Sequence, residues 1–477
     1  MMLGSGLLWT SLLVAAVSPT TARPGVAPGR SVRRNEDAAA AVNSLHEAGS
    51  RRGPGPWRIP SYVRMPVARE HFNVTGRGAL HARPPGPSRP PLAVLGNTST
   101  ENPAALAARQ AGNPRKWGWA GLEELGGIAY IIELQIGTPP QKVKVFIDTG
   151  SYELWVNPKC STSASESICQ SHGMYYPSRS RSSMFVGGGF AVTYGTGAVR
   201  GKYWADDINV AMFHVPRVQF AVADDSNYTF SGVLGLGYAY PHTINYPSVL
   251  NLMVSNDMIM APIFSVGLGG DQDNFSEIIF GGVNRWKFAG KLEPVAIWPP
   301  IKQQDPRWLQ YWVNVTSVGM TKPGERPVIY TQRDTFTMPV LLDTGSTLSY
   351  IREDLVAQIG QQFQAKIDHM GYYTVDCSWR NRPGTVDFGF NRGRMVINVR
   401  YKDFIWQQYP GHCLLGVQPA DVGSTAYVLG DTFIRGAYLV FDQQSDIVWM
   451  NQYYNCGDGV VTVGAEKGDP GNIVGAC

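Results

Sequence analysis

Charged residues and zinc-site spacings are both scarce in this chain. Asp, Glu, Lys and Arg make up only 16% of the 477 residues, and no Cys-x-x-Cys or Cys/His grouping among the six cysteines resembles a zinc site. Helical spacing is convincing only at 248–256 and 353–363. The tail, 451–477, is not apolar enough for a membrane or lipid anchor. These absences argue against a helical bundle, a zinc protein and an anchored protein, and we expect neither a metal nor an organic cofactor.

Glycine and proline are abundant instead, with 53 and 33 residues. Segments rich in Val, Ile, Tyr and Trp lie between turns, which favours β structure. The chain is long enough to bury two large cores.

The first 22 residues carry no charge and contain apolar runs at 7–9 and 12–17, followed by small residues. This pattern predicts a secretory signal peptide, although the usual basic residue at its start is missing. A buried N-terminal helix is the alternative. We therefore expect a secreted, extracellular protein, with delivery to an acidic vacuole as the alternative.

Residues 23–116 are rich in Pro, Arg, Ala and Gly, with 15 Arg and Lys against 5 Asp and Glu, a net charge of +10. Because the whole chain has +4, residues 117–477 carry −6. A disordered tail and a nucleic-acid-binding arm are the alternative interpretations of this basic segment. We favour a removable prosegment that covers the acidic body and leaves when low pH neutralises its carboxylates. Arg115-Lys116 is a candidate processing site.

One short stretch occurs twice, as Phe146-Ile-Asp-Thr-Gly-Ser151 and Leu342-Asp-Thr-Gly-Ser-Thr347. In each copy an apolar run predicts a buried strand that delivers Asp-Thr-Gly to a tight turn. A Val-Leu-Gly element follows both copies: 87 residues separate Asp148 from Gly235, and 87 separate Asp343 from Gly430. A single Asp-Thr-Gly is an ordinary turn, but two copies at matched spacing predict a duplicated chain whose halves each present one carboxylate.

Through these motifs, residues 126–450 resemble the pepsin-like aspartic proteases. The resemblance implies an all-β, bilobal fold with two similar β-barrel-like lobes, a central cleft and few short helices. We expect a signal peptide at 1–22, a basic prosegment at 23–116, an N-terminal catalytic lobe at 117–290 and a C-terminal catalytic lobe at 291–477, which ends in a short disulfide-tied tail. The lobe boundary near 290 follows from the change of repeat around 281–300.

The expected chemistry is peptide hydrolysis at acidic pH by water activated between Asp148 and Asp343. Two close carboxylates cannot both ionise easily, so the pair holds one proton and can serve as base and acid together. The remaining motif residues are predicted to support this dyad: Thr149 and Thr344 by linking the loops, Gly150 and Gly345 by admitting backbone amides, and Ser151 and Ser346 by hydrogen-bonding the outer oxygens. Plain turn formation is the alternative for the serines. Gly235 and Gly430 would support the loops from beneath.

The resemblance also implies a flap, a hairpin that would cover the cleft. Tyr194 would be its tyrosine, with Trp155 as the hydrogen-bond partner, and Gly195 and Thr196 would lie at its tip. Phe146, Tyr194, Phe230 and Val233 would line the pocket for the residue before the cut and favour large apolar side chains. Core filling is an equal alternative for these four residues. Because the tip carries Thr196 rather than an Asp, no preference for lysine is expected.

Two further stretches attract notice. Glu153 departs from the family pattern, and we expect its side chain to point into solvent. Residues 161–189, with their serines, arginines and Gly187-Gly-Gly189, indicate a flexible surface loop.

Six cysteines allow 15 pairings, and in an exported chain they imply disulfides. The resemblance suggests Cys160–Cys169 and Cys377–Cys413, which leaves Cys456 and Cys477 to pair with each other. Candidate glycosylation sites in the body of the chain are Asn227, Asn274 and Asn314.

These observations together predict a secreted aspartic endopeptidase, a monomer that acts on polypeptide substrates and is inhibited by its own prosegment. It would bind neither nucleic acid nor membrane. A catalytically silent relative that only binds is the main alternative; such proteins usually lose one Asp or the flap tyrosine, and this chain keeps all three. A nucleic-acid-binding protein would require 23–116 to persist in the mature chain.

Overall fold

The computed structural model describes residues 7–8, 66–67, 116–125, 127–163, 165–194, 197–240, 242–270, 276–299, 309–331, 335–420 and 426–477. The predictions for the signal peptide and the prosegment lie outside these residues, except for the short antiparallel pair β1 (Leu7–Leu8) and β2 (Pro66–Val67) and for Lys116. The predictions for Gly195, Thr196 and Asn274 also lie outside them.

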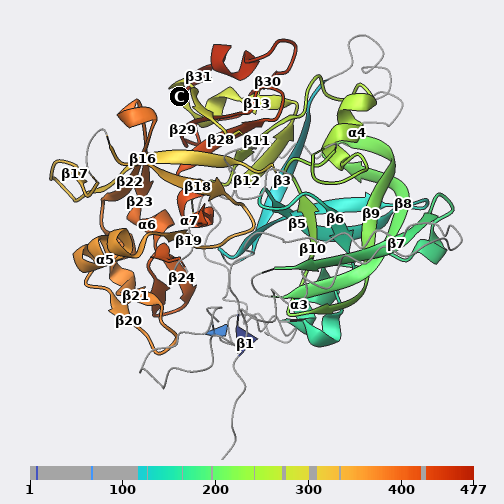
Figure 1. Cartoon of the computed structure of the whole chain (residues 1–477), viewed down its shortest axis with the longest axis horizontal. Helices are drawn as coiled ribbons and strands as arrows, with labels where there is room; N and C mark the ends of the chain where they lie inside the picture. The colour runs from blue at the N-terminus through green and yellow to red at the C-terminus, as the bar shows by residue number, and fades with distance from the viewer. Residues whose placement is uncertain are drawn as a thin grey trace, which may run out of the picture.

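The largest sheet has 13 strands and contains both early and late parts of the chain (Figure 1). Its order is β15-β29-β28-β11-β12-β3-β4-β5-β10-β6-β9-β8-β7. The strands are β3 (Gly118–Leu125), β4 (Ala129–Ile136), β5 (Gln141–Asp148), β6 (Leu154–Val156), β7 (Met184–Thr193), β8 (Ala198–Val210), β9 (Phe213–Asn227), β10 (Gly232–Gly235), β11 (Ile263–Gly267), β12 (Ser276–Phe280), β15 (Glu293–Ala296), β28 (Ala437–Asp442) and β29 (Ile447–Gln452).

A second sheet belongs to the later half of the chain. It comprises β16 (Trp312–Thr321), β17 (Val328–Ile329), β18 (Met338–Leu342), β19 (Ser349–Ile351), β22 (Thr385–Phe390), β23 (Met395–Arg400), β26 (Val417–Pro419) and β27 (Tyr427–Leu429). Smaller sheets join β20 (Lys366–Ile367), β21 (Tyr373–Val375), β24 (Trp406–Tyr409) and β25 (His412–Leu414), then β13 (Gly282–Asn284) with β30 (Val460–Thr462), and β14 (Ala289–Lys291) with β31 (Val474–Ala476).

The helices of the described residues are short: α3 (Glu166–Ser171), α4 (Val249–Ser255), α5 (Glu353–Gln362), α6 (Tyr401–Phe404) and α7 (Asp431–Ile434). Two of them, α4 and α5, confirm the predictions made for 248–256 and 353–363. Ser248 begins α4 with a capping box, in which its hydroxyl accepts from Asn251 N and the Asn251 side chain accepts from Ser248 N. None of the described helices is long and apolar enough to cross a membrane.

The predicted duplication is visible in the strand pairing. In the first half, β10 lies parallel to β5 and antiparallel to β6, so that Gly235 stands opposite Asp148. In the second half, β27 lies parallel to β18 and antiparallel to β19, with Leu429 opposite Leu342. Each Val-Leu-Gly element is therefore the strand between the two arms of an Asp-Thr-Gly loop. Matched sequence spacing has produced the same local topology twice.

The fold class is confirmed as predominantly β, with the first half of the chain and the later orange elements on opposite sides of the molecule in Figure 1. A large buried cluster packs side chains from both halves, including Ile147, Phe264, Tyr311, Leu342 and Phe441. A smaller apolar cluster, defined below as the flap cluster, belongs to the first half alone.

The prediction of a flexible loop over 161–189 is wrong. The segment contains α3, two 3-10 turns and the first residues of β7, which pairs with β8 from Met184 onward. Gly187 and Gly188 have φ of +88° and +78°, and the register of the β7–β8 ladder shifts there. The glycines therefore form bulges within a strand, because glycine tolerates positive φ and bulges need it.

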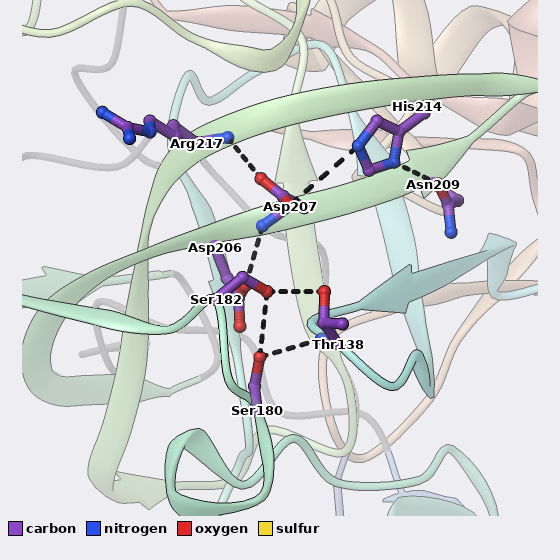
Figure 2. Close-up of polar contacts among 8 residues, drawn as sticks. All are labelled: Thr138, Ser180, Ser182, Asp206, Asp207, Asn209, His214 and Arg217. Atoms are coloured by element: carbon purple, nitrogen blue, oxygen red, sulfur yellow. Dashed lines mark hydrogen bonds and ion pairs between the residues drawn. The ribbon is translucent and has the colours of Figure 1, made fainter.

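The turn between β4 and β5 is fastened to the neighbouring hairpin by a polar network (Figure 2). Thr138 N donates to Ser180 Oγ at 2.9 Å, and Ser182 Oγ donates to Thr138 Oγ1 at 2.7 Å. Close by, Asp207 accepts from Arg217 N at 3.0 Å, and its own N–H donates to Asp206 Oδ1 at 2.8 Å. The network fixes the start of β5, the strand that ends at Asp148.

The six cysteines form three disulfides: Cys160–Cys169, Cys377–Cys413 and Cys456–Cys477. The candidate glycosylation sites differ in access. Asn227 is exposed at the end of β9, whereas Asn314 lies in the middle of the second sheet with its Oδ1 buried. A glycan on Asn227 has room, and one on Asn314 is disfavoured by this burial.

Candidate active site

Asp148 ends β5 and Asp343 directly follows β18, and the two carboxyl groups meet between the halves of the chain. Asp148 is 2% exposed and Asp343 is fully buried. The two carboxyl groups lie close enough for each to shift the pKa of the other. β5 and β18 bring the two residues into the interior because the apolar side chains at the ends of both strands are buried.

Each carboxyl group is held by its own loop in the same way. Gly150 N donates to Asp148 Oδ1 at 2.8 Å, and the Ser151 hydroxyl donates to Asp148 Oδ2. In the second loop, Gly345 N donates to Asp343 Oδ1 at 2.9 Å, and Ser346 Oγ donates to Asp343 Oδ2 at 2.6 Å. Both oxygens of each carboxyl group are thereby oriented.

The two threonines connect the loops across the molecule. Thr149 Oγ1 accepts from Thr344 N at 3.0 Å and donates to Leu342 O at 2.8 Å. Reciprocally, Thr344 Oγ1 accepts from Thr149 N at 3.1 Å and donates to Ile147 O at 3.1 Å. Four buried hydrogen bonds therefore set the separation of the loops, and hence of the two carboxyl groups.

The two glycines are required by close approach to the opposite carboxyl group. A Cβ on Gly150 would lie 2.6 Å from Asp343 Oδ1, and a Cβ on Gly345 would lie 2.7 Å from Asp148 Oδ1. Distances this short do not occur between real Cβ and oxygen atoms. Gly235 and Gly430 pack from behind, because a Cβ there would meet the backbone of residues 152–153 and of Ser346.

Burial and mutual repulsion set the ionisation of the pair. Burial raises the pKa of Asp148, while hydrogen bonds from Ser151 and Asp343 oppose the rise. Burial, and next the charge of Asp148, raise the pKa of Asp343 well above its usual range. The dyad of aspartic proteases is the standard example of this effect, in which like charges prevent the second ionisation. The pair titrates as a unit, so the proton belongs to neither residue alone.

The predicted flap and pocket residues that the structure describes belong to one apolar cluster. This flap cluster contains Ala129, Ile131, Phe146, Trp155, Ile168, Cys169, Phe190, Val192, Tyr194, Val199, Ala221, Phe230 and Val233. Trp155 Nε1 donates to Tyr194 OH at 2.6 Å, as the resemblance implied. Phe146 and Phe230 meet edge to face at 4.7 Å between centroids. All four proposed pocket residues are at least 94% buried, so both the pocket and the core interpretation stay open.

The expectation that Glu153 points into solvent is wrong. Its side chain is 6% exposed, and Oε1 accepts from Tyr203 OH at 2.7 Å and Tyr246 OH at 2.6 Å. The sequence held one usable signal: Glu153 lies two residues before Trp155, and alternate residues of an extended chain share a face.

Sequence reasoning also missed Asp431, the residue after Gly430. It is fully buried, and burial is the main cause that raises its pKa well above the usual range, with the charge of Asp343 adding to the rise and that of Arg435 opposing it. Arg435 is held by Tyr130 OH and Gly127 O, both at 2.9 Å. A third carboxyl group therefore lies within electrostatic reach of the dyad.

Among the described residues no group of three or more His, Cys, Asp or Glu has an arrangement suited to a metal ion.

Two buried carboxyl groups, crossed threonines and a flap tyrosine on a duplicated β fold define the class of pepsin-like aspartic proteases.

Comparison with known proteins leads to the same class. A family model described as eukaryotic aspartyl protease matches residues 129–452. A probable aspartic-type endopeptidase, opsB of Aspergillus fumigatus, is 30% identical over 330 residues, which cover 66% of each chain. Aspartic proteinase yapsin-3 of Saccharomyces cerevisiae is 30% identical over 336 residues, 66% of this chain and 64% of the relative. An aspartic proteinase from Irpex lacteus has a similar fold, with a TM-score of 0.57 at 18% identity over 72% of this chain and all of its own.

The chain spans about two thirds of the length of the curated relatives opsB and yapsin-3. The family model covers more than half of the chain, so the chain belongs to the eukaryotic aspartyl protease family.

Proposed function

We propose that this chain is an active aspartic endopeptidase that hydrolyses peptide bonds at acidic pH. The observation that carries the proposal is the pair of buried, hydrogen-bonded carboxyl groups of Asp148 and Asp343, each oriented by a backbone amide and a serine. A catalytically silent binding protein would have no need for both carboxyl groups, both serines and four crossed hydrogen bonds.

The reaction follows from one proton on two carboxyl groups. The ionised carboxylate takes a proton from a water molecule while the water oxygen attacks the scissile carbonyl carbon. The protonated carboxyl group donates its proton to the carbonyl oxygen. The tetrahedral intermediate then collapses: the C–N bond breaks, the leaving nitrogen receives a proton from one carboxyl group, and a hydroxyl of the intermediate returns its proton to the other carboxylate as the C=O bond re-forms. The dyad ends with one proton, as it began, so it is regenerated in each turnover.

The acidic range follows from the same burial. Because the pKa of Asp343 is raised, the pair keeps its shared proton as the pH rises from the acid side, and activity is lost when that proton leaves. Below the first ionisation both carboxyl groups are neutral and no base remains. Activity should therefore rise and fall with pH as a bell.

Substrate preference and cell biology complete the proposal. Phe146, Tyr194, Phe230 and Val233 would favour a large apolar residue before the cut. The protein would be a secreted monomer, with vacuolar delivery as the alternative, made with a signal at 1–22 and an inhibitory prosegment at 23–116. Its two lobes would cover 117–290 and 291–477. The Nζ of Lys116, the last residue of this prosegment, donates to Asp257 O at 2.5 Å.

The decisive experiment is cleavage of a denatured protein from pH 2 to 7, with and without pepstatin, by the wild type and by Asp148→Asn. We expect acid activity that both the inhibitor and the substitution abolish, because Asn cannot act as the base. Absence of cleavage at every pH, after removal of residues 23–116 is verified by mass spectrometry, would favour the silent relative.

A further inference from the structure

Glu153 forms a buried polar junction beside the dyad. Its Oε1 accepts two tyrosine hydroxyls, from Tyr203 on β8 and from Tyr246 just before α4, and the two tyrosine rings meet edge to face at 5.7 Å. The Glu153 backbone is enclosed as well: its O accepts from Gly235 N at 3.1 Å, and a Cβ on Gly235 would lie 2.4 Å from its N. The residue joins three parts of the chain that are far apart in sequence.

Two of its neighbours connect this junction to the flap hairpin, which we define as the paired strands β7 and β8 together with Tyr194. Trp155 lies in the flap cluster, whereas Leu154 and Val156 face the main core, so Glu153 falls on the same side as Trp155. Trp155 holds Tyr194 after the first arm of the hairpin, and Glu153 holds Tyr203 in the second arm. Tyr203 in turn packs edge to face on Phe190 of the first arm, at 5.8 Å.

The surroundings of the Glu153 carboxyl group lack a compensating cation. In the part of the chain that the structure describes, no Lys, Arg or His forms a hydrogen bond or ion pair with it, and Oε2 is buried without a hydrogen-bond partner. The titratable groups that face it are tyrosines alone: Tyr152 from its own loop, Tyr194 and Tyr203 from the flap hairpin, and Tyr246 before α4. From β10, the backbone of Gly235 meets the backbone of Glu153.

We propose that Glu153 is a positioning residue for peptide hydrolysis: its neutral carboxyl group holds the flap hairpin over the dyad through Tyr203, and its ionisation releases that hold. The inference rests on the proposed endopeptidase function. It gives the chain a second determinant of its acidic working range, separate from the dyad.

The direction of the effect follows from the charge. Burial raises the pKa of Glu153, although the two tyrosine hydroxyls favour the ionised form and oppose the rise. At acidic pH the group is neutral, and Oε1 keeps both hydroxyl donors. As the pH rises through the raised pKa, an uncompensated charge appears among aromatic rings, and water can reach it only if the hairpin moves away. The KM for peptides should then rise.

The test is a comparison of kcat and KM for one peptide from pH 2 to 7 in the full chain, processed identically for every variant. Glu153→Gln keeps the oxygen acceptor and cannot ionise, so at pH 3 its KM should be within about threefold of the wild type. At the upper end of the range its KM should stay low where that of the wild type rises. Tyr203→Phe keeps the ring and removes the donor, and should raise KM about 2- to 10-fold already at pH 3.

A matched control is Tyr238→Phe, which also removes a buried tyrosine donor to a carboxylate, Asp446, at 2.9 Å, outside the flap hairpin. Neither residue belongs to the flap cluster. This variant should lower the thermal midpoint and leave the pH profile of KM unchanged. If Glu153→Gln and wild type have superimposable KM profiles while both cleave, the positioning role is overturned and the proposed function stands. If the wild type itself never cleaves, the proposed function is the one that fails, and the positioning role falls with it.

Discussion

Replacement of Thr149 by Val removes one side of the crossed connection between the active-site loops and nearly preserves shape. The Thr149 hydroxyl makes two buried hydrogen bonds, accepting from Thr344 N at 3.0 Å and donating to Leu342 O at 2.8 Å. In the variant both backbone groups lose this partner. A buried unsatisfied group costs about 1–3 kcal/mol, and a carbonyl oxygen loses less because it has a second lone pair. We therefore expect a loss of roughly 2–4 kcal/mol in stability.

The same substitution should lower kcat more than KM is changed, because the loops set the separation of the carboxyl groups rather than the grip on the substrate. Misplacement of reacting groups by a fraction of an ångström is enough for about a tenfold loss. Urea unfolding at acidic pH, followed by tryptophan fluorescence, measures stability, and peptide cleavage measures kcat. Thr149→Ser is the control, since it keeps the hydroxyl and should behave as wild type. A Val variant with wild-type midpoint and wild-type kcat would refute the reasoning.

Two further predictions address the second loop and the 13-stranded sheet. Gly345→Ala should reduce kcat by at least about tenfold, because the new Cβ would lie 2.7 Å from Asp148 Oδ1 and displace it. Gly121→Ala is the control, since its nearest contact would be 3.3 Å and kcat should not fall. Equal kcat values for the two variants would contradict the prediction. Burial raises the pKa of Glu277 from its ordinary value of 4.5, so its stabilising contribution is complete below that value and is lost as the pH rises through the raised pKa. Glu277→Gln should flatten the thermal midpoint measured from pH 4 to 7, and an unchanged slope would count against it.

Much of the fold and of the dyad could be predicted because the chain repeats itself. The 87-residue spacing from Asp148 to Gly235 and from Asp343 to Gly430 reflects two equivalent sets of strand pairs. The helical spacing at 248–256 and 353–363 likewise predicted α4 and α5. These are local or repeated patterns, and a single sequence contains them in full.

Glu153 shows where such reasoning fails. Because charged residues are rarely buried, the sequence favoured a solvent-exposed side chain for Glu153. Its two hydroxyl partners, Tyr203 and Tyr246, are 50 and 93 residues away, and no local pattern announces that they converge. The prediction of a loop from the glycines at 187–189 was wrong for a related reason, since only the pairing of β7 with β8 distinguishes a bulged strand from a loop.

The place of β3 in the 13-stranded sheet affects how the protein is made. Trp119 in β3 pairs with Ile279 in β12, so 160 residues separate the partners (279 − 119), and Val266 in β11 pairs with Leu439 in β28, 173 residues later (439 − 266). At about 5–20 residues per second of synthesis, β3 waits roughly 8–32 s for its partner to be translated, and β11 waits about as long again for its own. The strands that join the two halves therefore meet last, when almost the whole chain has left the ribosome. Such distant pairing also makes closure slow, so the union of the halves is a late step of folding.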